Sequence, residues 1–335
     1  MRRPRSRRRS GAAVLVAAVM VVVVGWALVT HRGRGHTPSP TTTTTGPAPH
    51  RAAPVADAIG ITTFRVSDPR RTIRLPDGNT VPRSLVVTVR YPATGPAGGV
   101  DVPGAPPAAG RHPLIVFGHG YDITPTPYAA LLRSWVRAGY VVAAPTFPLA
   151  GPDAPGGPNE ADLVHQPADI SLVISRLEGG TGLPGVVRGI VDPRRVAVAE
   201  HSDGGDTALA VAYDPRFRDR RVDAAIILSG AEIPFVSAFR FPAAGPPLLA
   251  VQGTADTINL PSATQLFYVA AAPPKYLLTL FGMGHLPPYA TAQPALGVVE
   301  RTTIAFLDRY LGSGSDAAIA GAGKVTGVSA LRAAR

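Results

Sequence analysis

Three residues of the 335-residue sequence could together perform nucleophilic catalysis: Ser202, Asp256 and His285. A serine hydroxyl is a weak nucleophile by itself, because it needs a base to take its proton. An imidazole can take that proton, and a carboxylate can orient the imidazole and stabilise its charged form. Each of the three residues closely follows a short apolar run of the kind that forms a buried strand. The sequence therefore predicts a Ser–His–Asp triad with Ser202 as the nucleophile.

The turn around Ser202 has the residues that this chemistry requires. Residues 200–205 (EHSDGG) follow the apolar run 196–199 and lead into a helix-like stretch at about 205–213. The two glycines let a strand and a helix pass close together, which predicts a strained strand–turn–helix, the nucleophile elbow. The serine hydroxyl would then lie near a helix N-terminus, where backbone N–H groups can stabilise an oxyanion.

A second glycine-rich turn supplies a further element of the same chemistry. Residues 117–121 (FGHGY) end another apolar run, and their glycines allow the backbone to approach a substrate carbonyl closely. We therefore assign the oxyanion hole to the backbone N–H groups of Tyr121 and Asp203. His119 is expected to be structural, and His201 is expected to pack against the triad or support it.

The elements that must position these residues alternate along the chain. Apolar runs rich in Val and Ile predict strands near residues 85–89, 113–117, 140–144, 196–199, 224–228, 248–251 and 276–280. Helix-like segments lie between them, near residues 127–138, 168–178, 205–213, 262–271 and 295–311. This alternation predicts an α/β fold with a mostly parallel central sheet and helices on both faces. The carboxyl ends of parallel strands share one edge of the sheet, so the triad is expected to meet there.

Four of these motifs resemble the α/β-hydrolase superfamily: HG at 119–120, HSDGG at 201–205, GTAD at 253–256 and GH at 284–285. The chain is most similar to dienelactone-hydrolase-like, platelet-activating-factor-acetylhydrolase-like and polyester-hydrolase-like esterases, over about residues 60–312. The stretches QPAD at 166–169 and FLDRYL at 306–311 are also similar to that group. The resemblance implies the α/β-hydrolase fold and serine-dependent ester hydrolysis, with no metal or organic cofactor.

One residue departs from the family pattern. The superfamily elbow usually has a glycine two residues before the serine, and here Glu200 stands at that position. Three arrangements are open for its long side chain: a clash within the elbow, a position in the active-site cleft, or an ion pair with a neighbouring arginine.

Composition excludes several other classes of protein. The chain has no cysteine, so it has no disulfide, thiolate nucleophile, zinc finger or iron–sulfur cluster. Its formal net charge is +11, but residues 1–51 hold nine arginines and no Asp or Glu, which leaves 24 basic and 22 acidic groups in the rest. We therefore expect no nucleic-acid partner. The histidines have no ligand-like spacing, so no metal site is expected.

The first 57 residues are expected to determine the cellular location of the protein and not to fold with the catalytic domain. Residues 1–10 are a basic cytoplasmic segment, and residues 11–30 are an uncharged apolar run long enough to cross a bilayer as a signal-anchor. Residues 31–57 read as a Pro/Thr-rich linker. We expect a single-pass membrane protein whose catalytic domain, 58–312, lies outside the cytoplasm, followed by a C-terminal tail at 313–335. The alternative is a cleaved signal peptide and a secreted protein.

The predicted activity is hydrolysis of carboxylic esters through an acyl-enzyme, with a small-molecule or lipid-like ester as substrate. The apolar stretch around Phe235 and Phe239 is expected to line the acyl pocket. Two alternatives remain open at this point. One is a serine peptidase on the same fold, and the other is a catalytically silent binding module built on it.

Overall fold

The computed structural model describes residues 58–233 and 240–335. The strands are β1 Ala58–Arg74, β2 Thr80–Ala93, β3 Asp101–Pro103, β4 His112–Gly118, β5 Val141–Thr146, β6 Val191–His201, β7 Val222–Leu228, β8 Leu248–Gly253, β9 Lys275–Leu280 and β10 Ser329–Ala334. The α-helices are α1 Ala129–Arg137, α2 Gln166–Gly179, α3 Asp203–Tyr213, α4 Pro261–Ala270, α5 Pro287–Ala290, α6 Ala295–Leu311 and α7 Asp316–Gly323, with short 3₁₀ turns η1 Thr126–Tyr128, η2 Glu160–His165 and η3 Gly185–Val187. Every strand and helix expected between residues 58 and 312 is present.

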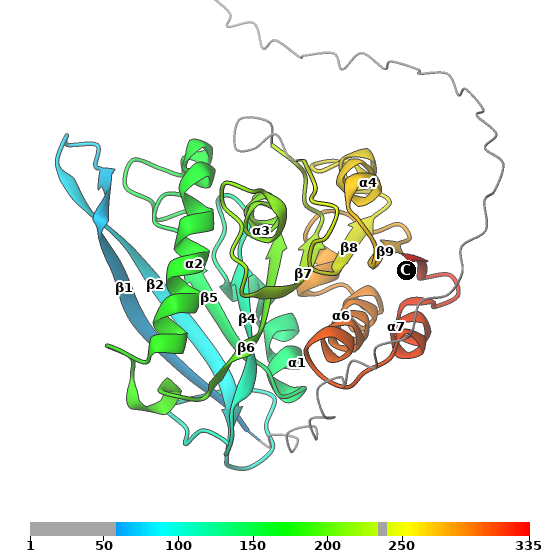
Figure 1. Cartoon of the computed structure of the whole chain (residues 1–335), viewed down its shortest axis with the longest axis horizontal. Helices are drawn as coiled ribbons and strands as arrows, with labels where there is room; N and C mark the ends of the chain where they lie inside the picture. The colour runs from blue at the N-terminus through cyan, green and yellow to red at the C-terminus, as the bar shows by residue number, and fades with distance from the viewer. Residues whose placement is uncertain (1–57, 234–239) are drawn as a thin grey trace, which may run out of the picture. The chain divides into compact units, whose positions relative to one another are not determined.

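One sheet organises the molecule, in the order β10-β9-β8-β7-β6-β4-β5-β2-β1-β3 (Figure 1). Its central strands β5, β4, β6, β7, β8 and β9 are parallel to their neighbours in this block. Antiparallel pairs occur only toward the edges, at β1–β2, β2–β5 and β9–β10 among the described strands. The predicted mostly parallel α/β sheet is thus confirmed, and its parallel block delivers several loops to one edge.

Each central strand is apolar on both faces because helices cover both. In β6, Val196 and Val198 belong to one core, while Ala197 and Ala199 belong to the other. The first core packs under α2, α3 and α4, and the second packs under α1 and α6. Figure 1 shows α2 and α3 in front of the strands and α6 on the side of α1. The alternation continues to the strand end, where neighbouring residues 200 and 201 point to opposite faces.

The structure extends the catalytic domain beyond the boundary expected at residue 312. There, α7 and β10 follow, and β10 pairs antiparallel with β9 from Ser329 opposite Leu280 to Ala334 opposite Lys275. Residues 316–334 therefore complete one edge of the sheet. The sequence analysis also did not predict the strands at the other edge of the sheet, β1 and β3.

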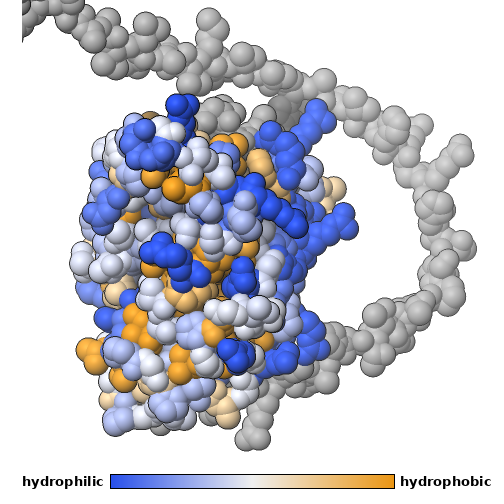
Figure 2. All heavy atoms as spheres, turned by 90° about the vertical axis from the view of Figure 1, so that its left-hand side faces the viewer, coloured by the Kyte–Doolittle hydropathy of each residue, from blue (hydrophilic) through white to orange (hydrophobic). Residues whose placement is uncertain are grey.

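The face beside β1 and β2 has a mixed surface (Figure 2), on which hydrophilic side chains surround scattered apolar ones. A cavity of about 680 Å³ opens between this hairpin and residues 146–155. None of Ser202, Asp256 and His285 lines it.

The predicted basic segment 1–10, transmembrane segment 11–30 and linker 31–57 lie outside the described residues. Within the described residues, none of the helices combines the length and the apolar character needed to cross a bilayer. The membrane-anchor prediction stays a prediction.

Candidate active site

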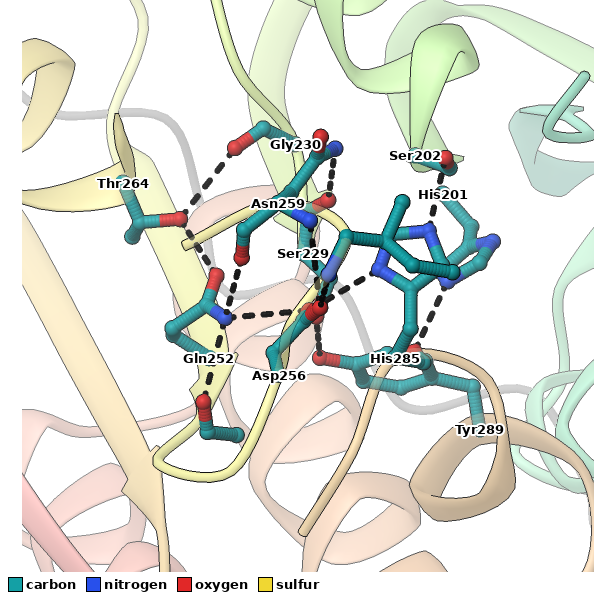
Figure 3. A network of polar contacts seen from close by, with 12 residues as sticks. His201, Ser202, Ser229, Gly230, Gln252, Asp256, Asn259, Thr264, His285 and Tyr289 are labelled. Carbon is teal, nitrogen blue, oxygen red and sulfur yellow. Dashed lines mark hydrogen bonds and ion pairs between the residues drawn. The ribbon is translucent and has the colours of Figure 1, made fainter. Parts of the chain in front are cut away.

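The three residues expected to form the triad come together at the carboxyl edge of the sheet (Figure 3). Ser202 follows β6, Asp256 follows β8 and His285 follows β9. His285 Nε2 lies 2.7 Å from Ser202 Oγ, and His285 Nδ1 lies 2.8 Å from Asp256 Oδ2. The hydroxyl, imidazole and carboxylate thus form one continuous hydrogen-bonded series.

Ser202 has the backbone strain that the elbow predicts. Its φ is +61° and its ψ is −124°, in a region that residues with a side chain rarely adopt. The turn is fixed on both sides, because the Ser202 N–H donates to Leu228 O at 3.0 Å and the Gly205 N–H donates to Ser202 O at 2.8 Å. A side chain at Gly205 would come within 2.7 Å of the Gly230 backbone. The glycine therefore allows α3 to begin directly behind the serine.

Asp256 is positioned by its own loop as well as by the histidine. Its Oδ1 accepts backbone N–H groups from Ile258 at 3.0 Å and Asn259 at 3.1 Å, and its Oδ2 accepts from Gln252 Nε2 at 3.1 Å. Burial acts to raise the pKa of Asp256, but the hydrogen bonds from His285 and from the Ile258 N–H outweigh it and hold that pKa below its usual value. The carboxylate therefore stays ionised and can orient the imidazole.

Sequence reasoning missed the polar residues that hold this loop. Gln252 Nε2 also donates to Asn259 O at 3.1 Å, and Thr264 Oγ1 donates to Gln252 Oε1 at 2.6 Å. Asn259 Nδ2 donates to Ser229 O at 2.7 Å, which ties the loop to the end of β7. Figure 3 shows this network on the side of Asp256 away from Ser202. The one available signal was a glutamine at the end of an otherwise apolar strand.

His201 supports the histidine loop, as the sequence analysis expected. Its Nδ1 lies 2.7 Å from Tyr128 Oη, and its Nε2 lies 3.0 Å from the His285 carbonyl oxygen. Burial, together with the neighbouring His285, lowers the pKa of His201 to about 3. The ring is therefore neutral, so that Nε2–H donates to His285 O and Nδ1 accepts from Tyr128. Tyr128, which the sequence analysis did not single out, fixes this tautomer.

Tyr121 and Asp203 both line the cavity that contains Ser202, which has a volume of about 810 Å³. Among the described residues, neither backbone N–H donates a hydrogen bond. A side chain at Gly120 would lie 3.0 Å from Ser202 Cβ, so the glycine brings this turn against the nucleophile. His119 is buried, and its Nε2 accepts from the Phe147 N–H at 3.0 Å, which agrees with the expected structural role.

Glu200 adopts none of the three arrangements that the sequence left open. It is fully buried on the α3 face of β6, where a side chain at Gly118 would touch it, and it lies outside the 810 Å³ cavity. Neither of its carboxyl oxygens has a hydrogen-bond partner in the described part of the chain. Burial, with a contribution from Asp206, raises the pKa of Glu200 well above its usual value. The elbow accommodates the side chain because Gly118 leaves room for it.

Two further carboxyl groups near the elbow are also held unusually. Asp203 Oδ2 and Asp206 Oδ2 are buried, and neither has a hydrogen-bond partner in the described residues. Burial, reinforced by Glu160, raises the pKa of Asp203 to about 6. Burial is also the largest cause that raises the pKa of Asp206 to about 7. We name Glu200, Asp203 and Asp206 the elbow carboxyls.

The described residues contain no cluster of three or more His, Asp or Glu side chains with metal-binding geometry. The two phenylalanines predicted to line the acyl pocket, Phe235 and Phe239, lie outside the described residues.

Comparisons with known proteins agree with this architecture. Residues 77–227 match the chlorophyllase family model. The fold is similar to a ferulic acid esterase from Streptomyces cinnamoneus, with a TM-score of 0.61 and 24% sequence identity over 80% of this chain and 96% of that one. No curated protein sequence matches the chain.

Proposed function

We propose that the chain is a carboxylic ester hydrolase with the α/β-hydrolase fold, which acts through Ser202, His285 and Asp256 and a covalent acyl-enzyme. The observation that carries this proposal is the pair of hydrogen bonds, 2.7 and 2.8 Å long, that joins the three side chains. The strained backbone of Ser202 supports it, since strain of this kind concentrates where function requires it. The dienelactone-hydrolase-like, acetylhydrolase-like and polyester-hydrolase-like subfamilies stay a prediction.

The first half of the reaction forms the acyl-enzyme. His285 Nε2 takes the Ser202 hydroxyl proton while Oγ attacks the ester carbonyl carbon, and His285 Nδ1–H donates to Asp256 throughout. The carbonyl oxygen becomes an oxyanion, which the N–H groups of Tyr121 and Asp203 bind. The ester C–O bond then breaks, and His285 gives its proton to the departing alcohol.

The second half reverses these roles with water as the nucleophile. His285 removes a proton from a water molecule, whose oxygen attacks the acyl carbon, and the same two N–H groups hold the second oxyanion. The bond to Ser202 Oγ breaks, His285 returns the proton to the serine, and the carboxylic acid leaves. The neutral His201 holds the His285 backbone carbonyl during both halves, so the imidazole keeps its orientation.

The substrate that the cavity fits best is an ester with a small or medium-sized acyl or alcohol group. The cavity of about 810 Å³ combines apolar residues such as Ile123 and Leu286 with polar groups near the nucleophile. An ester substrate also agrees with the similarity to a ferulic acid esterase.

Replacing the nucleophile tests the proposal. The Ser202→Ala protein is expected to lose hydrolysis of p-nitrophenyl acetate by about a thousandfold or more and to lose labelling by a fluorophosphonate, with an unchanged melting temperature. Ser175→Ala, at an exposed serine of α2, is the matched control and should keep both. Turnover retained in Ser202→Ala would reject the assignment. A matched anilide assayed in parallel separates an esterase from a peptidase.

We also propose the location that the sequence predicts, with residues 11–30 as a membrane anchor and the catalytic domain outside the cytoplasm. Support comes from the charge-free apolar run that follows the arginine-rich segment. Fractionation with protease protection of intact cells tests it. Recovery of the full-length chain in the cytosol would reject it.

A further inference from the structure

We propose that α4 and the loop before it dock the catalytic domain on an anionic lipid bilayer beside the opening of the active-site cavity. The apolar part of this surface consists of four side chains that solvent reaches freely. Their exposed fractions are 69% for Ile258, 55% for Leu260, 72% for Leu266 and 64% for Val269. We name these four residues the α4 patch. They fall within twelve consecutive residues, whereas exposed apolar side chains elsewhere on a soluble surface are usually scattered singly.

Helical spacing places part of the α4 patch on one face. Leu266 and Val269 are three residues apart in α4, so they are neighbours on the helix surface. The opposite face of the same helix packs on the core through Thr264, Phe267 and Tyr268. The helix thus has one face buried in the protein and a second face on which large apolar side chains have no covering in the described structure. An amphipathic surface of this kind binds at a lipid interface.

Two basic side chains frame that outer face. Arg332 donates to Gln265 Oε1 at 2.6 Å and stacks over the Tyr268 ring, with its guanidinium carbon 4.6 Å from the ring centroid. Lys275 donates to the Val269 carbonyl at 2.9 Å, at the C-terminal end of α4. Basic groups beside inserted apolar side chains favour anionic over neutral lipid surfaces.

The surrounding sequence lacks groups that would oppose this attraction. Residues 257–299 contain no Asp and no Glu, although they cover the loop, α4, β9 and the histidine turn. An anionic surface would therefore meet no acidic side chain from this segment. A protein partner or a second copy has no such requirement for a uniform charge, and this is why we favour a lipid surface.

The α4 patch is continuous with the active site. Ile258 lines the 810 Å³ cavity and is also exposed, and its N–H donates to the triad carboxylate of Asp256. A bilayer held against the α4 patch would face the cavity opening, so that an ester dissolved in the lipid could enter it. This use of the surface rests on the proposed ester hydrolysis, whereas docking itself does not.

Vesicle binding tests the docking step. Residues 48–335 form one compact unit with its own core, so this unit can be studied without the predicted anchor. We expect it to cosediment with phosphatidylcholine vesicles that contain phosphatidylglycerol, and less with phosphatidylcholine alone. Leu266→Ser with Val269→Ser should weaken binding by about tenfold or more, because two apolar contacts with lipid are lost. Removing one positive charge with Arg332→Gln should weaken it by about fivefold.

A matched pair of substitutions controls for exposed apolar area. Val100 and Val102 are 65% and 41% exposed, and they lie in and before β3, at the opposite edge of the sheet from β9 and β10. Val100→Ser with Val102→Ser should leave vesicle binding unchanged. Equal losses in both pairs, or no binding by the wild-type unit, would overturn the proposal. So would light scattering that shows a dimer which Leu266→Ser with Val269→Ser converts to a monomer, because the α4 patch would then be an interface between copies.

The inactive variant separates docking from catalysis. Ser202→Ala should bind vesicles as the wild type does, because Ser202 is not part of the α4 patch. If it binds but still hydrolyses esters, the triad assignment fails and docking stands. If it is inactive but neither it nor the wild type binds, docking fails and the triad assignment stands.

Discussion

Two of the groups of ionisable side chains in the described structure differ sharply in how their hydrogen bonds and charges are compensated. The first joins the β1–β2 hairpin to η2 and α2 through Arg83, Asp162 and Asp169, which are 1%, 3% and 0% exposed. Arg83 donates to both oxygens of Asp162, at 2.7 and 2.8 Å, and to both oxygens of Asp169, at 2.6 to 3.0 Å. Burial alone would lower the pKa of Arg83, but these two carboxylates raise it, so the guanidinium stays charged.

Within the described residues, no cation forms an ion pair with the elbow carboxyls. Among the eight buried side-chain atoms in the described structure that lack a hydrogen-bond partner, four belong to Glu200, Asp203 and Asp206. Without a positive partner, burial favours the neutral acid, and this is why the pKa of each of the three is raised.

The contrast shows where the fold tolerates uncompensated polar groups. An ion cluster with every hydrogen bond made can fasten one layer to another and define a single arrangement. Buried carboxyl oxygens without partners destabilise the folded state, and here four of them lie next to the nucleophile in the sequence, where backbone strain is also found. The two groups should therefore respond differently to substitution and to pH.

Breaking the satisfied cluster should have the largest effect. Arg83→Met removes the side chain that pairs with both Asp162 and Asp169, leaving two buried carboxylates with too few partners. We expect the free energy of unfolding to fall by about 3–5 kcal/mol, measured by urea denaturation at pH 7. Arg65→Met, at an exposed position of the same strand pair, is the control. A loss no larger than that of the control would remove the distinction between the two groups.

Asp206→Asn should raise the free energy of unfolding, in contrast to Arg83→Met, and the size of the increase should depend on pH. Burial raises the pKa of Asp206 in the folded state to about 7, above its ordinary value of 3.8, so the folded protein binds the proton more tightly than the unfolded chain does. The stabilisation of the folded state that comes from binding this proton is complete below about pH 4, and it is lost as the pH rises to and through 7. Asparagine stays neutral and keeps the oxygen that accepts the Ile233 N–H at 3.0 Å.

The measurement is the difference in unfolding free energy between Asp206→Asn and the wild type across pH. We expect the variant to be more stable by on the order of 2–4 kcal/mol at pH 8, and this advantage should shrink as the pH falls and vanish below about pH 4. A difference that does not change with pH would show that Asp206 does not titrate in this range.

The smallest effect is expected for Glu200→Gln. Burial raises the pKa of the Glu200 carboxyl and so favours its neutral form, and glutamine is neutral and has nearly the same volume. Stability at pH 7 should change by less than about 1 kcal/mol, and kcat for p-nitrophenyl acetate should stay within about twofold. Glu200→Lys is the contrasting substitution, since it places a longer cation against Gly118. A large loss of kcat in Glu200→Gln would show that an acidic proton is needed under the elbow.

Much of this architecture could be predicted from the sequence, because it rests on local patterns. The continuous apolar runs predicted the six strands of the parallel block and part of β2, and the residues after three of these strands predicted Ser202, Asp256 and His285 as neighbours. The edge strands were missed for a physical reason. β1 mixes apolar with charged residues and contains Pro69, and β10 reads SALRAA, so neither has the pattern of a buried strand.

The environment of Glu200 could not be predicted, because it depends on residues distant in sequence. Its position follows from the space at Gly118 on β4 and from the start of α3, and no motif encodes that combination. The roles of Gln252, Tyr128 and Thr264 could not be predicted for the same reason, since each of them acts through a hydrogen bond to a different element.

The alternation at the end of β6 has a consequence for how this gene can change over time. Glu200 faces the side of α3, and His201 faces the side of Tyr128 and His285. Deleting one codon within residues 196–199 would reverse both directions, so that Glu200 would turn toward the face of Tyr128 and the imidazole of His201 would leave it. Single substitutions along β6 change one side chain and leave the directions of the others intact. Insertions and deletions reverse those directions, so we expect selection against them. The length of β6 should therefore stay constant among related proteins that keep the activity.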